Sequence, residues 1–291
     1  MGVAVLTDST SYLPRDVREQ LHIGVVRLSS TLDGVTYSDD AEDFGPFYRA
    51  LGSTQRFPTM SQPSIQDLVD AIEAPVAAGD GVVGVFISAE MSGTYSAALL
   101  ARDVVLERHP GAEVAVLDAR SNSMELGYAA MAAARDALAG GTVEGAVAAA
   151  RAMMERTRLL FVPDTLEFLR RGGRISGTVA LVGSALSVYP LLTVVDGGMN
   201  VFARARSKAG ALDEVVVAFA ADLDACGGLD EAVVHHIQAE AEASELAARL
   251  ADVAGRDVRL APVGPAIGAH VGPGAIGVAY STLEPMRKDR R

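Results

Sequence analysis

Short apolar runs alternate with helical stretches through the first half of this chain, and several of the runs end in a polar loop. The clearest run spans residues 81–87, starts at a glycine and leads into Ser88-Ala89-Glu90-Met91-Ser92-Gly93-Thr94. A short apolar run of this kind is typical of a buried strand in a parallel sheet. Strands that alternate with helices predict right-handed crossovers between parallel strands. We therefore expect residues 1–158 to form an α/β domain with a parallel sheet.

Three of the expected strands, residues 3–6, 82–87 and 114–117, are followed by polar loops. These loops are residues 8–11, 88–94 and 118–123, and each carries serine or threonine hydroxyls. Ligands of open parallel sheets bind at the carboxyl ends of the strands. The first N–H groups of a helix after such a loop also favour an anion. The loops therefore predict one polar binding site, although Ser92 or Thr94 would serve equally well as an ordinary helix cap.

The pattern changes at about residue 159, where the regular alternation ends. Asp196-Gly197-Gly198 separates two apolar runs and predicts a hairpin. Further helices are expected at 209–225 and 243–253, and further strands at 232–237, 258–262 and 274–280. We expect a second domain of the α+β class over residues 159–282, followed by a charged tail over 283–291.

The composition excludes several classes of function. The formal charge of −12 argues against a general surface for nucleic acid or anionic membrane, both of which need basic patches. Almost all the basic charge is arginine, because lysine occurs only at Lys208 and Lys288, and arginine suits carboxylate or phosphate. The single cysteine, Cys226, rules out an internal disulfide and fits a reducing compartment. With no leader and no spanning apolar stretch, the sequence predicts a soluble cytoplasmic protein.

Several other motifs point to less specific chemistry. Residues 272–277 match the dinucleotide pattern G-x-G-x-x-G, but they lead into a strand-like run rather than a helix. The acidic stretch 39–43 lacks the spacing of a calcium loop and is expected to be a solvated helix start. His270 lies in a glycine-rich bend that would present its imidazole to a ligand, and a structural role fits the sequence equally well. Arg174 follows a two-glycine turn that caps a short helix.

Together these motifs identify the chain as a member of the DegV family, whose characterised members bind fatty acids and partner a fatty acid kinase. The resemblance extends over nearly the whole chain. The matching stretches, in order, are Thr7-Asp8-Ser9-Thr10, Ser61-Gln62-Pro63-Ser64, Ile87-Ser88, Met91-Ser92-Gly93-Thr94-Tyr95, 118–124, 165–176 and 270–274. The resemblance implies a fold of two domains with one fatty acid held between them.

By motif position, the resemblance implies that Ser92 contacts the carboxylate and that Arg174 and His270 belong to the surrounding polar network. The N–H groups near Gly93 and Thr94 would help to offset the cost of burying the carboxylate. No catalytic residue, metal or cofactor is implied.

The resemblance also implies a site for the partner protein. Arg206 is similar to the arginine with which the family docks the kinase. Arg204 lies two residues earlier and shares its face if this stretch is a strand.

One position departs from the family pattern. The family usually has Thr-Ser-Gln-Pro in the loop before Ser64, and its threonine is a second carboxylate contact, but here Met60 precedes Ser61. Thr59 cannot substitute, because neighbouring side chains in an extended segment point in opposite directions. Either one hydroxyl fewer holds the carboxylate, or the ligand differs.

The energetics suit a carrier. Burying about fifteen methylenes at ~0.8 kcal/mol each gives ~12 kcal/mol before the costs of ordering. We therefore expect a protein that buries the chain of a long-chain fatty acid and presents its carboxyl group to the kinase for acyl-phosphate formation. A transient membrane contact is left open. The alternatives are a serine acyl-hydrolase using Ser92 and His270, and a binder of a small phosphorylated metabolite at the same loops.

Overall fold

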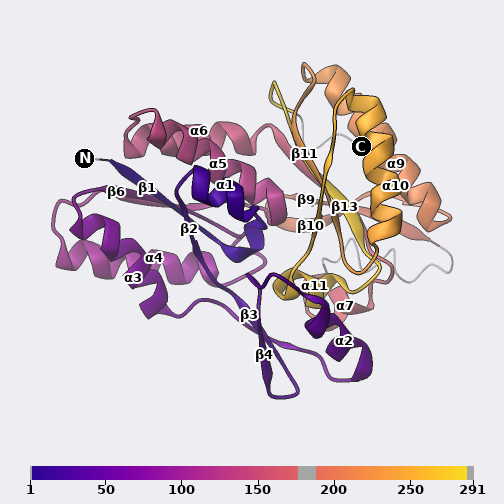
Figure 1. The fold of residues 1–291 in the computed structure, drawn as a ribbon, viewed down its shortest axis with the longest axis horizontal. Helices are drawn as coiled ribbons and strands as arrows, with labels where there is room; N and C mark the ends of the chain where they lie inside the picture. Colours follow the sequence, from indigo (N-terminus) through magenta and orange to yellow (C-terminus); the bar gives the residue numbers. More distant parts are fainter. Residues whose placement is uncertain (1, 176–187, 287–291) are drawn as a thin grey trace.

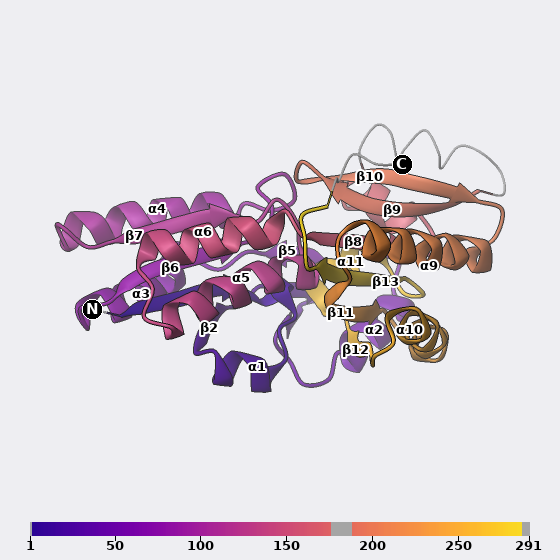
Figure 2. The ribbon, with the colours of Figure 1, turned by 90° about the horizontal axis from the view of Figure 1, so that it is seen from above.

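The computed structural model describes residues 2–175 and 188–286. Within these ranges the strands form a four-stranded sheet, a six-stranded sheet and a small three-stranded sheet. The two larger sheets lie at opposite ends of the molecule (Figure 1 and Figure 2). The predicted α/β fold, with a parallel-sheet part followed by a mixed-sheet part, is confirmed.

The four-stranded sheet has the order β2-β1-β6-β7, and every neighbouring pair is parallel. Its strands are β1 (Val3–Asp8), β2 (Ile23–Val26), β6 (Gly81–Phe86) and β7 (Val114–Asp118), with α1 (Arg15–Gln20) between the first two. One face is covered by α3 (Ile65–Ala77) and α4 (Thr94–Arg108), the other by α5 (Ser123–Leu138) and α6 (Val143–Met154). β6 is apolar throughout because it is buried on both faces.

The six-stranded sheet has the order β10-β9-β8-β13-β11-β12 and is antiparallel except for its last pair. Its strands are β8 (Thr157–Val162), β9 (Tyr189–Val195), β10 (Gly198–Ala205), β11 (Leu229–His236), β12 (Arg259–Pro262) and β13 (Ile276–Thr282). Helices α9 (Lys208–Ala225) and α10 (Glu240–Ala254) pack on one face. The opposite face packs with α5 in the core that joins the two sheets. The predicted hairpin is β9–β10, and its Asp196 and Gly197 both have positive φ, 53° and 85°.

The third sheet connects the two ends of the molecule. It consists of β3 (Ser29–Leu32), β4 (Val35–Ser38) and β5 (Thr59–Ser61) in the order β4-β3-β5, and α2 (Gly45–Ser53) lies between β4 and β5. Beside it lie the short helices α7 (Glu167–Arg171) and α11 (Pro265–Val271) (Figure 1). β3 and β4 form a hairpin around Asp33-Gly34, whereas the preceding residues 23–26 pair with β1.

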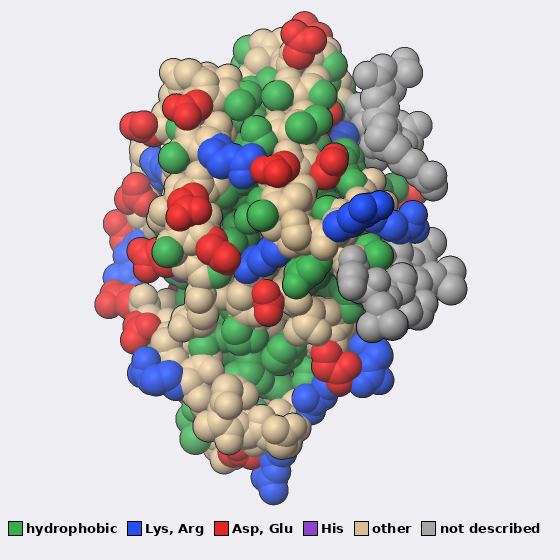
Figure 3. Space-filling model, turned by 90° about the vertical axis from the view of Figure 1, so that its right-hand side faces the viewer, with side chains coloured by type: hydrophobic (Ala, Val, Ile, Leu, Met, Phe, Trp, Pro, Cys, Tyr) green, Lys and Arg blue, Asp and Glu red, His purple; other side chains and the backbone are tan. Residues whose placement is uncertain are grey.

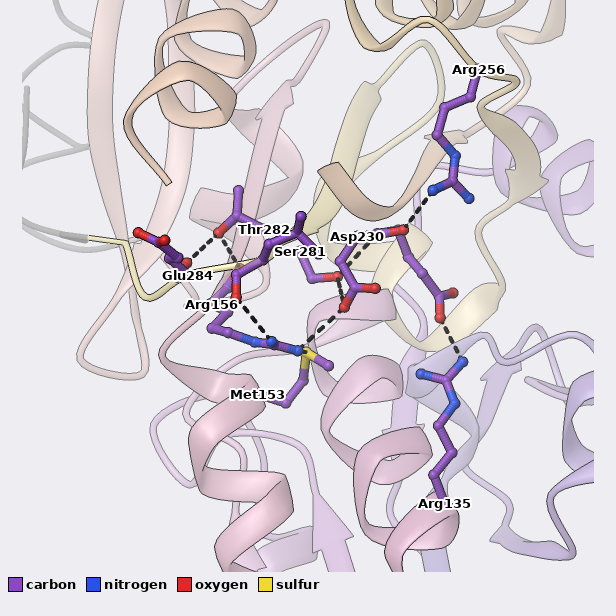
Figure 4. Close-up of polar contacts among 10 residues, drawn as sticks. Arg135, Met153, Arg156, Asp230, Arg256, Ser281, Thr282 and Glu284 are labelled. Atoms are coloured by element: carbon purple, nitrogen blue, oxygen red, sulfur yellow. Dashed lines mark hydrogen bonds and ion pairs between the residues drawn. The ribbon is translucent and has the colours of Figure 1, made fainter. Parts of the chain in front are cut away.

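Ion pairs link α5 and the turn after α6 to β11 of the second sheet (Figure 4). Arg135 of α5 pairs with Glu231 at 2.6 Å, and Arg156 pairs with Asp230 at 3.3 Å. The hydroxyl of Ser281 donates to the same Asp230 carboxylate. The chain passes from one sheet to the other between α6 and β8, next to the expected boundary at 158/159. The division into two domains stays a prediction.

The acidic stretch 39–43 differs from its prediction. α2 begins only at Gly45, and Asp39 is buried rather than solvated, with 1 % of its surface exposed. Its carboxylate accepts a hydrogen bond of 2.7 Å from the backbone N–H of Ala266 in α11, far along the chain. Acidic residues in a run are usually exposed to solvent, so the sequence suggests exposure for Asp39. Its burial depends on a contact with α11, which only the tertiary structure shows.

The surface and the end of the chain add two observations. No helix in the described ranges is long and apolar enough to cross a membrane. On the face drawn in Figure 3, acidic, basic and hydrophobic side chains are interspersed, so its described residues do not form the continuous basic patch that nucleic acid requires. Of the expected charged tail, residues 287–291 lie outside the described residues.

Candidate ligand-binding site

The three polar loops meet at one edge of the parallel sheet. Strands β1, β6 and β7 are neighbours, so the loops that follow them are neighbours too. Thr10 from the first loop, Ser92 from the second and Asn122 from the third line the same cavity, which we call the first cavity. Its volume is about 520 Å³, including the part open to solvent. The convergence expected from the sequence therefore creates a lined cavity.

Asp8 holds the first two loops together. Its carboxylate accepts hydrogen bonds from the N–H of Thr10 at 3.0 Å and from the N–H of Ile87 at 2.8 Å. Burial raises the pKa of this carboxyl, and the hydrogen bonds from Thr10 and Ile87 lower it in part. The cavity edge is thus fixed by a buried, hydrogen-bonded carboxyl rather than by flexible loops.

Ser92 stands just before the first turn of α4. Its hydroxyl is 2.9 Å from the hydroxyl of Thr94 and accepts from the Thr94 N–H at 3.3 Å. Gly93 between them has no side chain, and a Cβ there would lie 2.3 Å from Oε1 of Gln62. The end of the flexible Gln62 side chain, which follows β5, therefore lies close to Gly93 at the start of α4.

Arg174 and His270 also line the first cavity, and together with Ser92 they form what we call its polar mouth. Arg174 donates from Nε to the carbonyl of Met91 at 3.1 Å and from a terminal nitrogen to the carbonyl of Gly172 at 2.7 Å. A Cβ at Gly172 would lie 2.1 Å from Nδ1 of His270, so glycine is needed for this close packing. Burial first, and the charge of Arg174 second, lower the pKa of His270 to about 4. The imidazole is therefore neutral at neutral pH.

Of the site residues expected from the sequence, the structure brings Met60, Ser92, Arg174 and His270 into the wall of the first cavity. Ser61, Gly93 and Thr94 lie beside that wall but do not line it; Ser61 and Gly93 are exposed and Thr94 is buried. Arg204 and Arg206 are exposed and do not line the first cavity. Whether any of these residues binds a ligand or a partner stays a prediction.

Met60 contributes an apolar side chain to the wall of the first cavity. Its sulfur accepts a hydrogen bond from the hydroxyl of Ser30 at 3.2 Å, while Thr59 and Ser61 on either side are exposed. The alternation of an extended strand therefore keeps Thr59 out of the cavity. Because Met60 stands where the family pattern has threonine, the mouth of this protein has one hydroxyl fewer than that pattern implies.

The helix that carries His270 was not expected from the sequence. Residues expected to form a glycine-rich bend are the helix α11, whose Gly268 admits Tyr48: a Cβ there would lie 1.9 Å from the Tyr48 hydroxyl oxygen. That hydroxyl donates to the carbonyl of Val263 at 2.6 Å. Asp39 completes the support by accepting from the N–H of Ala266. Gly268 inside so short a helix, with Gly264 before it and Gly272 after it, weakens the helical pattern, and tertiary contacts stabilise the helix.

A second cavity continues from the first. The two share four lining residues, which are Asn122, Met199, Ile267 and Val271. The second has a volume of about 420 Å³, including its open part, and is mostly apolar, with Leu159 and Phe161 from β8 and Val263 before α11 among its walls. Thr10, Asn122, Met199 and Ile267 were not among the expected site residues; only the hydroxyl loops at the strand ends signalled the first two.

The geometry gives the alternative functions less support. The hydroxyl of Ser92 pairs with that of Thr94, and Nδ1 of His270 has no hydrogen-bond partner among the described residues. A serine nucleophile needs a base within hydrogen-bond reach, so this arrangement is not that of a prepared hydrolase. A small phosphorylated metabolite would leave the apolar second cavity unfilled.

The fold and the two joined cavities define an α/β protein with a parallel and a mixed sheet, whose apolar second cavity adjoins a polar mouth. The chain belongs to the DegV family: the family model described as "Uncharacterised protein, DegV family" matches residues 2–283.

Relatives and solved structures agree with this assignment. The chain is 42 % identical over 287 residues to a DegV domain-containing protein of Clostridium acetobutylicum, covering 99 % of this chain and 100 % of that one. Its fold matches a fatty-acid-binding DegV family protein from Thermus thermophilus with a TM-score of 0.87 and 30 % identity, covering 97 % and 100 % of the two chains. It also matches a stearic acid-binding protein from Eubacterium ventriosum with a TM-score of 0.87 and 25 % identity, covering 96 % and 98 %.

Proposed function

We propose that this protein binds a long-chain fatty acid, with the carboxyl group at the polar mouth and the acyl chain in the second cavity. The observation that carries the proposal is that the lining changes from polar to apolar between two cavities that share four wall residues. Ser92, Arg174 and His270 line the first cavity, whereas the second is lined mostly by apolar side chains. Structures of similar fold bind fatty acids, and one of them binds stearic acid.

The mouth supplies what a carboxylate needs. A buried carboxylate must be paired or hydrogen-bonded, since leaving it alone costs more than the acyl chain gains. The hydroxyl of Ser92 and the guanidinium of Arg174 offer donors and positive charge, and the neutral imidazole of His270 offers one further N–H. With Met60 at the wall, the carboxylate is held by fewer hydroxyls and relies more on Arg174.

The protein acts in this proposal as a carrier and has no catalytic residue. It presents the carboxyl group to a fatty acid kinase, which forms the acyl-phosphate. The support for the partner is the family resemblance together with the exposure of Arg204 and Arg206, which are available to another protein. The mouth is partly open to solvent, so a carboxyl group there can be reached from outside.

The test is native mass spectrometry of the protein purified from bacteria without detergent. We expect a mass increase that corresponds to one long-chain fatty acid, which disappears after delipidation and returns when stearate or oleate is added. A clean unliganded mass, with no uptake of either fatty acid after delipidation, would reject the proposal. Retention of a phosphorylated metabolite instead would support the competing function.

A further inference from the structure

His235 is a polar residue in the wall of the apolar second cavity. It lies on β11, and side chains alternate along a strand, so it shares a face with Val233 and Ile237. That face belongs to the core between the two sheets, together with Leu159 and Phe161. Only 4 % of His235 is exposed to solvent. The imidazole is therefore enclosed with the apolar side chains that surround the proposed acyl chain.

One ring nitrogen of His235 is paired and the other is not. Nδ1 lies 3.3 Å from the carbonyl oxygen of Ala261 on the adjacent strand, and because a carbonyl only accepts, Nδ1 carries the proton. Nε2 is then an acceptor, and this buried atom has no hydrogen-bond partner among the described residues. Burial lowers the pKa of His235 to about 4, so the ring stays neutral at neutral pH. A buried acceptor without a donor is costly, and natural cores rarely contain one.

None of the other polar residues that line this cavity, Asn122, Ser123 and His236, hydrogen-bonds to that nitrogen. The side-chain amide of Asn122 donates to the sulfur of Met91 at 3.1 Å. His236 borders the cavity too, but alternation turns its side chain to the opposite face of the strand. Tyr12 approaches the His235 ring edge-on, with ring centroids 6.0 Å apart, and its hydroxyl is directed to Asp39 and Gly264. A molecule in the cavity, water or ligand, can supply the missing donor.

We propose that the second cavity selects an acyl chain that bears a hydroxyl group, and that this hydroxyl donates a hydrogen bond to Nε2 of His235. The inference rests on the proposed binding of a fatty acid and names its class as hydroxylated. Three chains of equal length would interact differently with Nε2. A hydroxyl satisfies the acceptor, an unsubstituted chain leaves it unpaired, and a keto group places a second acceptor against it.

The direct test uses the unaltered protein. Displacement of a fluorescent fatty acid is titrated with stearate, with hydroxystearates substituted at successive carbons, and with the keto analogue of each. We expect one hydroxy isomer to bind about tenfold or more tightly than its keto analogue, and more tightly than stearate, as one satisfied buried acceptor implies. Equal affinities of the hydroxy and keto chains at every carbon would mean that bound water satisfies Nε2, and would overturn the inference.

Replacing His235 tests whether this residue causes the preference for a hydroxylated chain. In His235→Phe the preference for the best hydroxy isomer over its keto analogue should fall to about twofold or less, while stearate binds at least as tightly as before. The control is His109→Phe, which lies outside both cavities at the end of α4 and should keep the preference. If His235→Phe fails to fold, the hydroxy and keto comparison in the unaltered protein still decides. Failure of all these fatty acids to bind would reject the proposed function itself, whereas binding without hydroxyl preference rejects only this inference.

Discussion

The two ends of the proposed binding site are built by different kinds of sheet. The polar mouth comes from loops at the carboxyl ends of parallel strands, where Thr10, Ser92 and Asn122 meet. The apolar second cavity comes from one face of the mixed sheet and from α11. The loops at the carboxyl ends of parallel strands lie side by side, so their hydroxyls and unpaired N–H groups come together. On the face of a sheet, every second residue of each strand contributes its side chain.

The difference extends to how each end is held in place. Hydrogen bonds to the buried carboxyl of Asp8 fix the mouth. Close packing positions the wall of α11, where Gly268 and Gly172 admit Tyr48 and His270. A polar group at the mouth should therefore affect recognition of the head group, and a volume change in the second cavity should affect recognition of chain length.

The largest effect is expected from blocking the junction of the two cavities. Met199 lines both, and in Met199→Trp the chain cannot pass from one to the other. Excluding about six methylenes at ~0.8 kcal/mol each should weaken stearate binding by at least about 100-fold. Octanoate, measured in the same displacement titration, should change by less than about threefold. The volume-conserving Met199→Leu is the control. Unaltered stearate affinity in the Trp variant would place the chain elsewhere.

Asp39 connects the two halves of the chain: it lies in the first half, and its carboxyl accepts a hydrogen bond from the N–H of Ala266 in α11. Burial raises its pKa to about 8, from 3.8 in an exposed carboxyl. Between these values the folded state binds more protons than the unfolded state, so Asp39 lowers the free energy of unfolding as pH rises. His235 and His270, with pKa values lowered to about 4, act in the opposite direction below pH 6.5.

Asp39→Asn should therefore gain stability relative to the unaltered protein as pH rises from 5 to 8, by up to about 1.4 kcal/mol per pH unit. Denaturant unfolding at both pH values measures it. Asp43→Asn, an exposed position in the same stretch, is the control. A difference between Asp39→Asn and the unaltered protein that is the same at pH 5 and pH 8 would contradict the buried-carboxyl assignment.

A smaller effect is expected from the head-group contact. Ser92→Ala should weaken stearate binding about tenfold, because it removes one hydrogen bond to a charged group. Binding of octadecanol, which has no charge to stabilise, should change less. Ser96→Ala, which changes an exposed serine near the start of α4, should bind like the unaltered protein. Equal losses for the acid and the alcohol would show that Ser92 supports the structure and not the carboxylate.

The smallest effect on lipid binding is expected at the proposed partner surface. Arg206→Ala should leave stearate affinity within about twofold, because the residue is exposed and lines neither cavity. Acyl-phosphate formation by the kinase should fall, and a titration of the loaded protein against the kinase measures it. Arg102→Ala on the distant helix α4 is the control. Full kinase activity with Arg206→Ala would reject this surface.

The sequence predicted the mouth better than the chamber behind it. Hydroxyl loops after apolar runs are local signals, and parallel topology alone places them side by side. That signal found Ser92 and the loop of Asn122. The helix α11 was missed because Gly268 weakens the local helical pattern, and the packing of Tyr48 that explains it joins residues more than 200 positions apart. His235 could not be assigned to the cavity, since the face of β11 that meets the first sheet depends on how the two sheets pack.

The most direct test of the account is a crystal structure of the delipidated protein loaded with 18-bromooctadecanoic acid, measured at the bromine absorption edge. We expect the anomalous bromine peak in the second cavity, near Phe161 and Val263, and carboxylate density within hydrogen-bond distance of Ser92. A bromine peak at the mouth beside Arg174, or outside both cavities, would contradict the proposed site and orientation.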